Sequence, residues 1–148
     1  MVDKKINIAF NGFGRIGRNL IRKLINDPKY NIVAINARTT VGVRAHLFKY
    51  DSIHGPFEGT IETELDNLII NDHVIPNFDR STPKKLPWEE LDVDYVIDST
   101  GKFCDYHSLH QHIEAGAKNV IVTSPAKDVD ATLTVSYTHL TLPTTPYV

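Results

Sequence analysis

A glycine-rich hexapeptide near the start of the chain constrains the fold more than any other feature. Gly12-Phe13-Gly14-Arg15-Ile16-Gly17 follows a short apolar run, Ile6 to Phe10, and precedes apolar residues at helical spacing from Ile16 to Ile25. A second apolar run extends from Ile32 to Ile35. A strand, a GxGxxG turn, a helix and a second strand within about thirty residues are typical of a dinucleotide-binding βαβ unit.

Each glycine of this turn has its own physical reason. Gly12 permits the tight turn, Gly14 lets a pyrophosphate approach the backbone, and Gly17 lets the helix pack closely on the strand. The N–H groups at the start of the helix, including those of Arg15 and Ile16, then face the phosphates. A glycine-rich loop that binds nothing is the alternative, and the flanking strands and helix count against it.

The rest of the chain alternates between helical and strand patterns. We expect helices over 41–49 and 107–115, a buried strand over 95–98 and a further strand over 120–122. Residues 57–76 instead contain three short strand patterns separated by turns rich in Asp and Asn. The sequence therefore predicts an α/β fold: a Rossmann-type, doubly wound and mostly parallel sheet with a small antiparallel excursion, incomplete at its C-terminal end.

Composition limits the classes of function. The 148 residues carry a net charge of -2, which gives no basic footprint for nucleic acid or an anionic membrane surface. The early apolar run is too short for a signal-peptide core or a membrane span. The single cysteine, Cys104, cannot form an internal disulfide and favours a reducing compartment, so we expect a cytoplasmic protein.

Ala37 occupies the position, about twenty residues beyond the turn, where an acidic residue usually binds the ribose hydroxyls. A carboxylate there would repel a 2′-phosphate by about 1 to 4 kcal/mol. Alanine removes that repulsion, and Arg38 can pair with the phosphate, helped by the hydroxyls of Thr39 and Thr40. This pattern favours NADP over NAD. The alternative is that Arg38 is solvated and that the site binds NAD with one contact fewer.

Several motifs in order resemble the N-terminal half of glyceraldehyde-3-phosphate dehydrogenase, and the resemblance runs from about Lys5 to Thr134. The motifs are NGFGRIGR at 11–18, LFKYDSIHG at 47–55, LPW at 86–88, DSTGKF at 98–103, AGAK at 115–118 and VTSPAK at 122–127. Most members of that family carry aspartate where Ala37 stands here.

The resemblance implies roles for individual residues around a dinucleotide. Asn11, Arg15 and Ile16 would hold the pyrophosphate and the neighbouring ribose. Ser99, Thr100 and Gly101 would line the adenine side, with Phe103 beside the cofactor. Thr123 would lie near the nicotinamide end. Arg80 resembles an adenine-side arginine, in a loop one residue longer than is usual in the family. The expected cofactor-binding residues are Asn11, Gly12, Phe13, Gly14, Arg15, Ile16, Gly17, Ala37, Arg38, Arg80, Ser99, Thr100, Gly101, Phe103 and Thr123.

No catalytic or metal-binding residue is predicted. Members of the family form a thioester on a cysteine within a Ser-Cys-Thr-Thr-Asn motif, activated by a histidine much later in the chain, and neither feature occurs here. Cys104 lies outside any matching motif and is interpreted as a packing or loop cysteine. His107 and His110 have a spacing that metal ligands use, but no third ligand is evident.

The resemblance also divides the chain. We expect residues 1–135 to form the NAD(P)-binding domain, with the catalytic domain absent. Residues 136–148 contain no Asp, Glu, Lys or Arg and resemble translated sequencing-adapter read-through, so we expect a non-native tail. A genuine linker, or an edge strand over 137–142, is the alternative.

The parent enzyme implied by the resemblance is a cytoplasmic homotetramer that oxidises glyceraldehyde 3-phosphate with phosphate and NAD(P). We expect the present chain to bind cofactor at most, to be inactive, and to self-associate or be unstable, because apolar surface that the missing parts would cover is exposed. A parent acting on erythrose 4-phosphate and a non-catalytic nucleotide-binding module are the alternatives.

Overall fold

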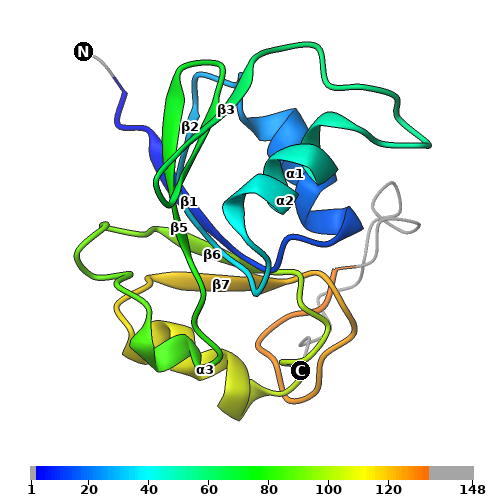
Figure 1. The fold of residues 1–148 in the computed structure, drawn as a ribbon. Helices are drawn as coiled ribbons and strands as arrows, with labels where there is room; N and C mark the ends of the chain where they lie inside the picture. The colour runs from blue at the N-terminus through cyan, green and yellow to red at the C-terminus, as the bar shows by residue number, and fades with distance from the viewer. Residues whose placement is uncertain (1–2, 134–148) are drawn as a thin grey trace.

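A computed structural model describes residues 3–133 of the chain (Figure 1). Its elements, in chain order, are β1 (Ile6–Asn11), α1 (Arg15–Leu24), β2 (Tyr30–Asn36), α2 (Val41–Lys49), β3 (Ile61–Glu64), β4 (Asn67–Ile70), β5 (His73–Phe78), the 3₁₀ turn η1 (Pro83–Lys85), β6 (Tyr95–Asp98), α3 (Tyr106–Glu114) and β7 (Asn119–Val122). The strands form one seven-stranded sheet in the order β3-β4-β5-β2-β1-β6-β7.

Strand β5 joins two kinds of sheet. Its start pairs antiparallel with β4, and its end, at Asn77 and Phe78, pairs parallel with β2. From there β2, β1, β6 and β7 continue in parallel. In the part of the chain that the structure describes, five strands therefore follow the Rossmann order, one fewer than the usual six. The predicted fold class and its antiparallel excursion are confirmed.

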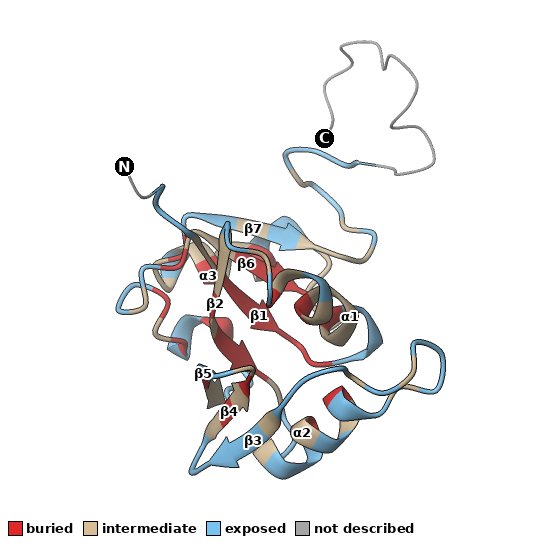
Figure 2. Cartoon of the chain, turned by 90° about the horizontal axis from the view of Figure 1, so that it is seen from above, coloured by how far each residue is buried: buried red, intermediate tan, exposed pale blue. Residues whose placement is uncertain are grey.

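The helices cover both faces of this sheet, with α1 and α2 on one face and α3 on the other (Figure 1). Successive residues of β1 alternate between the two cores: Ile8 and Phe10 face the larger one, under α1 and α2, while Ala9 faces the smaller one, which contains Trp88. Buried residues accordingly run along β1, in the middle of the sheet (Figure 2). The sheet is thus packed on both sides, as buried parallel strands require.

Two local expectations need correction. Ile16 was expected on the buried face of α1, but its side chain is 52% exposed. Asn67 was expected in a turn, whereas it begins β4 and the turn is made by Leu65 and Asp66. Leu65 adopts a positive φ of 53° and is exposed, which is unusual for leucine. The register of β3 against β4, which pairs Glu64 with Asn67, sets the place of this turn.

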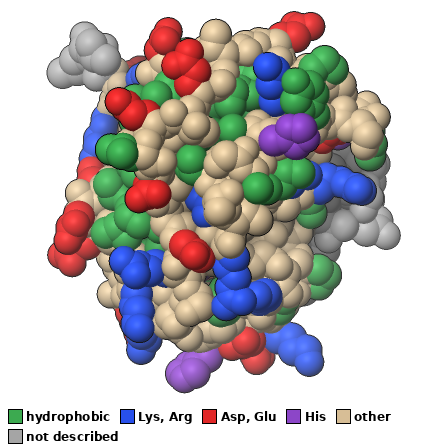
Figure 3. All heavy atoms as spheres, viewed as in Figure 1, with side chains coloured by type: hydrophobic (Ala, Val, Ile, Leu, Met, Phe, Trp, Pro, Cys, Tyr) green, Lys and Arg blue, Asp and Glu red, His purple; other side chains and the backbone are tan. Residues whose placement is uncertain are grey.

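Charges are mixed over the surface. Figure 3 shows acidic and basic side chains interspersed on one face of the molecule, with no broad basic area on that face. Over residues 3–133, the helices are too short and too polar for any of them to span a membrane.

Candidate functional site

The site lies where the strand order of the parallel sheet reverses, between β1 and β6. Both strands end at this edge, at Asn11 and Asp98. The chain leaving β1 is tied to both neighbouring strands, because Gly12 N–H donates to Asn36 O at 2.8 Å and Ser99 N–H donates to Asn11 O at 2.8 Å. In doubly wound sheets, ligands bind in the crevice outside the carboxyl ends of strands at such a reversal.

The three glycines of the turn are in three different situations. Gly12 has a φ of +105°, which side chains rarely adopt. A Cβ on Gly17 would lie 2.7 Å from Ser99 Oγ and 2.9 Å from Gly12 O, so the start of α1 is pressed against the turn. A Cβ on Gly14 would meet nothing within 4 Å, so this glycine faces open space. The turn therefore leaves room at the one glycine where a phosphate should approach.

Helix α1 begins directly at this space. Gly14 is its N-cap and offers no side-chain cap, and the first helical bond of the turn runs from Arg18 N–H to Gly14 O at 3.0 Å. The N–H groups that precede Arg18 in the helix consequently lack acceptors within it. Together with the positive end of the helix dipole, they fit the pyrophosphate of a dinucleotide.

The expected residues around the turn divide by burial. Arg15 and Ile16 are exposed beside the open space. Phe13 is 7% exposed and packs on Phe48 of α2, with ring centroids 6.2 Å apart, so its side chain belongs to the core. Only the backbone of Phe13 lies at the turn.

A buried carboxylate organises the strand ends. Asp98 is fully buried, and its Oδ2 accepts a hydrogen bond from Asn11 Nδ2 at 2.8 Å while its Oδ1 accepts from Thr100 N–H at 3.1 Å. Burial acts to raise the pKa of Asp98, but hydrogen bonds from His112, Thr100 and Asn11 together lower that pKa below its ordinary value. The carboxylate is thus ionised and fully occupied by donors.

The loop after β2 forms the second part of the site. Ala37 is half-buried and follows the end of β2, while Arg38 is exposed. A hollow of about 790 Å³ opens beside this loop, between the start of α2 and the end of β5, and the glycine turn lies outside it. Arg38, Thr39 and Thr40 all line this hollow, as a 2′-phosphate site after β2 would require.

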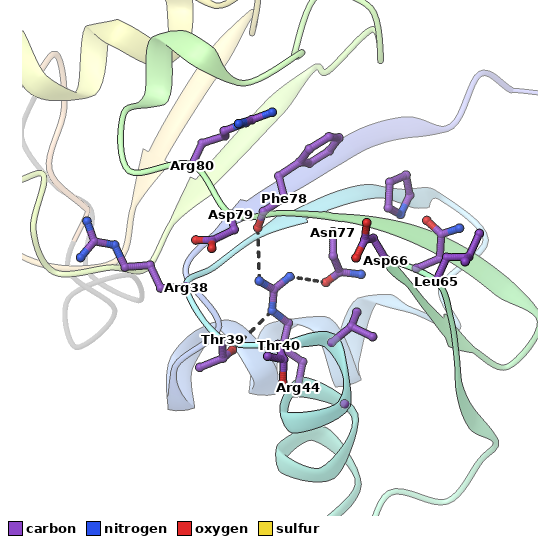
Figure 4. Close-up of a pocket in the computed structure, with 14 residues that line it drawn as sticks. Arg38, Thr39, Thr40, Arg44, Leu65, Asp66, Asn77, Phe78, Asp79 and Arg80 are labelled. Carbon is purple, nitrogen blue, oxygen red and sulfur yellow. Dashed lines mark hydrogen bonds between the residues drawn. The ribbon is translucent and has the colours of Figure 1, made fainter.

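Arg44 of α2 lies at the base of this hollow (Figure 4). Its guanidinium is buried and donates to the backbone carbonyls of Ala37 and Phe78 and to the side chains of Asn77 and Thr39. All four acceptors are neutral. Burial lowers the pKa of Arg44 and the charge of nearby Asp79 raises it in part, but an arginine stays charged at neutral pH.

The remaining expected residues lie along the same edge of the sheet. Thr123 follows β7 and its N–H donates to Asp98 O at 3.0 Å. Phe103 is half-buried, and its ring packs edge-on against His112 of α3, with centroids 6.4 Å apart. Arg80 is exposed, but its backbone N–H donates to Asn36 Oδ1 at 2.8 Å. Thr123 and Arg80 are therefore bonded to the ends of β6 and β2.

Cys104 and the paired histidines lie apart from any reactive arrangement. Cys104 is half-buried and its thiol donates to Gly101 O at 3.4 Å. His107 is exposed, and the ring of His110 stacks on Tyr106 with centroids 5.3 Å apart. Within residues 3–133, no group of three or more His, Cys, Asp and Glu side chains lies close enough together to hold a metal ion.

Comparison with known proteins agrees with this geometry. Residues 6–106 match the sequence profile of the family described as "Glyceraldehyde 3-phosphate dehydrogenase, NAD binding domain". The chain belongs to this family. The matched region contains β1, the glycine turn, the loop after β2 and β6.

Individual relatives show how much of the family this chain represents. It is 45% identical over 129 residues to glyceraldehyde-3-phosphate dehydrogenase 2 of Bacillus subtilis, covering 87% of this chain and 38% of that protein. It is 45% identical over 130 residues to the Thermotoga maritima enzyme, covering 86% and 39%, and 41% identical over 128 residues to that of Geobacillus stearothermophilus, covering 86% and 38%. The chain thus spans less than two fifths of the length of these relatives, as an N-terminal fragment of the family does.

Four residues of the site were not identified from the sequence. Asn36 and Asp98 are polar and follow apolar runs, where buried polar side chains require partners, and that signal was available. His112 gave no such signal, because its segment, 106–114, is mostly polar. Arg44 gave a weaker signal, because a charged residue on a helix is usually solvated.

Proposed function

We propose that this chain is the cofactor-binding part of a phosphorylating glyceraldehyde-3-phosphate dehydrogenase, and that it binds a dinucleotide at the β1–α1 turn. The observation that carries this proposal is the combination of open space at Gly14 with unpaired N–H groups at the start of α1. A bound dinucleotide would supply the hydride acceptor for oxidation of the aldehyde. Residues of this chain would bind and orient it.

Titration calorimetry with ADP-ribose, NAD and NADP tests the proposal. Binding of ADP-ribose with one site per chain is the expected result, because all three molecules share the pyrophosphate that the turn would hold. Absence of heat and of any ligand-dependent rise in the urea midpoint would refute it.

We further infer that the site accepts NADP, with the 2′-phosphate beside Ala37. The side chain of Ala37 cannot accept a hydrogen bond from a free ribose 2′-hydroxyl. The hollow beside it is lined by three cations and two carboxylates: Arg38, Arg44, Arg80, Asp66 and Asp79. Arg44 has only neutral acceptors, so a phosphate would provide a buried positive charge with its first direct counter-ion.

The substitution Ala37→Asp tests this preference. A carboxylate at this position accepts from the 2′-hydroxyl of NAD and repels the 2′-phosphate, so the ratio of NADP to NAD affinity should fall by about tenfold or more. Ala37→Ser, which adds a hydroxyl without charge, is the matched control. An unchanged ratio in Ala37→Asp would mean that the 2′-phosphate lies elsewhere.

For the 148 residues alone we propose binding without turnover, in a cytoplasmic setting. They contain no Ser-Cys-Thr-Thr-Asn motif, and Cys104 has no base beside it among the contacts of the described residues. Aldehyde-dependent reduction of NAD(P) by the purified chain would contradict this. We also propose that the parent enzyme oxidises glyceraldehyde 3-phosphate and assembles as a tetramer.

Self-association of the chain is proposed from one edge of the sheet. In the described residues, β7 is the outermost strand of the parallel part, and Ile121 on it is 48% exposed. Unpaired strand edges with apolar side chains are templates for association. We also propose that residues 1–135 form the domain and that residues 136–148 are a non-native tail. The tail lies outside the described residues.

A further inference from the structure

A buried histidine and tryptophan lie on the face of the sheet opposite α1 and α2. His112 of α3 and Trp88 are both 0% exposed. Trp88 Nε1 donates to His112 Nδ1 at 3.0 Å, and the two rings are stacked with centroids 6.2 Å apart. Neither side chain reaches the surface where a dinucleotide would bind. Their position in the core raises the question of what the histidine does there.

The tryptophan determines the tautomer of the histidine. An indole N–H can only donate, so His112 Nδ1 must accept and the imidazole proton must lie on Nε2. Nε2 is 3.1 Å from Asp98 Oδ2, and its N–H therefore donates to that carboxylate. A proton added at Nδ1 would point at the tryptophan N–H. The contact with Trp88 thus aims the Nε2–H donor of His112 at Asp98.

Asp98 is hydrogen-bonded in turn to the loop that follows β6. Its Oδ1 accepts from both the N–H and the hydroxyl of Thr100, at 3.1 Å and 2.7 Å. This loop lies close to the glycine turn, since a Cβ added to Gly12 would be 3.0 Å from Ser99 C and from Thr100 N. Ser99 Oγ also donates to Gly12 O at 3.3 Å, so a shift of Asp98 would change how Ser99 and Thr100 lie relative to the glycine turn.

A second branch leaves Asp98 through Asn11. Asn11 Nδ2 donates to Asp98 Oδ2 at 2.8 Å, and Asn11 Oδ1 accepts from Asn36 Nδ2 at 2.7 Å. Asn36 in turn accepts from Arg80 N–H at 2.8 Å and donates to Arg80 O at 2.9 Å. The hydrogen bonds thus run without a break from the smaller core to the ends of β1, β2, β5 and β6.

We propose that His112, oriented by Trp88, is a positioning residue for dinucleotide binding. It acts through Asp98 and sets the 99–101 loop and Asn11 against the glycine turn. This inference rests on the proposed function, because it requires that the turn binds the pyrophosphate. A histidine with only a structural role would contribute to stability and leave the affinity of the folded chain unchanged.

The chain offers matched variants that separate the two roles. His112→Leu removes both hydrogen bonds and retains an apolar side chain. His112→Gln can rescue the function, since its amide presents an N–H donor and a carbonyl acceptor to Asp98 and Trp88. Leu109→Val is the control, because Leu109 lies on the same helix, is buried, and belongs to no hydrogen-bonded network of the site.

The dissociation constant of ADP-ribose is measured for each variant by calorimetry, together with urea unfolding, under conditions where the variant is folded. We expect His112→Leu to bind about five- to tenfold more weakly, the equivalent of one or two lost hydrogen bonds in the positioning of the site. His112→Gln should recover to within about twofold of the wild-type chain, and Leu109→Val should stay there despite its lower stability.

Wild-type affinity in folded His112→Leu would overturn the inference, as would an equal loss in Leu109→Val. If His112→Leu does not fold, Trp88→Phe replaces it. That variant leaves Asp98 and the histidine in place but frees the tautomer, so it should bind about two- to threefold more weakly, and unchanged binding would also overturn the inference. Failure of the wild-type chain to bind ADP-ribose is a separate result, which would overturn the proposed function and this inference with it.

Discussion

Gly14 and Gly17 stand three residues apart, yet the structure gives them opposite roles, and alanine at each position separates binding from folding. A methyl group on Gly14 enters open space, whereas one on Gly17 would lie 2.7 Å from Ser99 Oγ and 2.9 Å from Gly12 O. Gly14→Ala should therefore weaken nucleotide binding with little change in stability. Gly17→Ala should lower stability first.

The magnitudes follow from the local backbone. Gly14 has φ -79° and ψ -168°, an extended conformation that alanine also adopts. The loss of a favourable N-cap and the reduced freedom of the unfolded chain oppose one another, so the change in unfolding free energy should stay within about 0.5 kcal/mol. The methyl group would displace the pyrophosphate from its N–H donors, and the loss of one charge-assisted hydrogen bond weakens binding by about tenfold.

For Gly17→Ala the added methyl group meets two atoms: Ser99 Oγ can rotate away, but Gly12 O belongs to the backbone and cannot. Overpacking of this kind costs about 1 to 3 kcal/mol, and the higher helix propensity of alanine offsets up to about 1 kcal/mol of that cost. We expect a net loss of roughly 1 kcal/mol. Trp88 is the only tryptophan of the chain and is buried, so its fluorescence follows urea unfolding of both variants.

Calorimetry with ADP-ribose completes the comparison. Gly14→Ala with wild-type affinity would show that the phosphate does not contact this turn, and the proposed function would fail with it. A loss of stability in Gly14→Ala as large as that in Gly17→Ala would show that the open space at Gly14 is not available in the folded chain.

Three further predictions concern the surroundings of the site. Arg44→Met should lower the ratio of NADP to NAD affinity by about fivefold, while Arg44→Lys retains most of it; equal effects of the two changes on that ratio would refute a role for the charge. The pKa of Asp98 lies below its ordinary value of 3.8, so its contribution to stability is complete above that pH and is lost as the pH falls through the lowered value. Asp98→Asn should therefore lower the urea midpoint at pH 7 and flatten its decline below about pH 4; an equally steep decline in the variant would assign it to other carboxylates. Ile121→Lys on the edge strand β7 should reduce self-association in analytical ultracentrifugation and leave ADP-ribose affinity unchanged, and undiminished association would place the contact elsewhere.

Most of the architecture was predictable from local patterns. The apolar runs that form β1 and β2 can be read from neighbouring residues, and so can the break between β1 and α1 at Gly12 and Gly14. The predicted helix over 41–49 is found unchanged as α2. β5 was only partly predictable. Its end, Asn77 and Phe78, pairs with β2 and follows Pro76, and proline and asparagine are poor strand signals without the partner strand.

The interior of the site was much harder to predict, because its partners are far apart in the chain. Asp98 and Asn11 are separated by 87 positions, and Arg44 and Asn77 by 33. Only the fold brings such donors and acceptors together, and a single sequence gives no register between distant strands. Arg44 illustrates the difficulty: α2 alone gave no reason to bury it, and its acceptors come from β5 and from the loop after β2.

The location of the site explains why we expect less than two fifths of a family member's length to retain binding. The proposed contacts to the dinucleotide come from the ends of β1, β2, β5, β6 and β7, from the loops that follow them, from the first residues of α1 and from Arg44 of α2. These ends are held together by Asp98, Asn11 and Asn36 inside the sheet. The same hydrogen bonds therefore join the parallel strands and hold the site residues in place. Among the described residues, the half-exposed Ile121 lies on β7, the outermost strand of the parallel part. We therefore expect association through this edge to lower solubility before it lowers affinity.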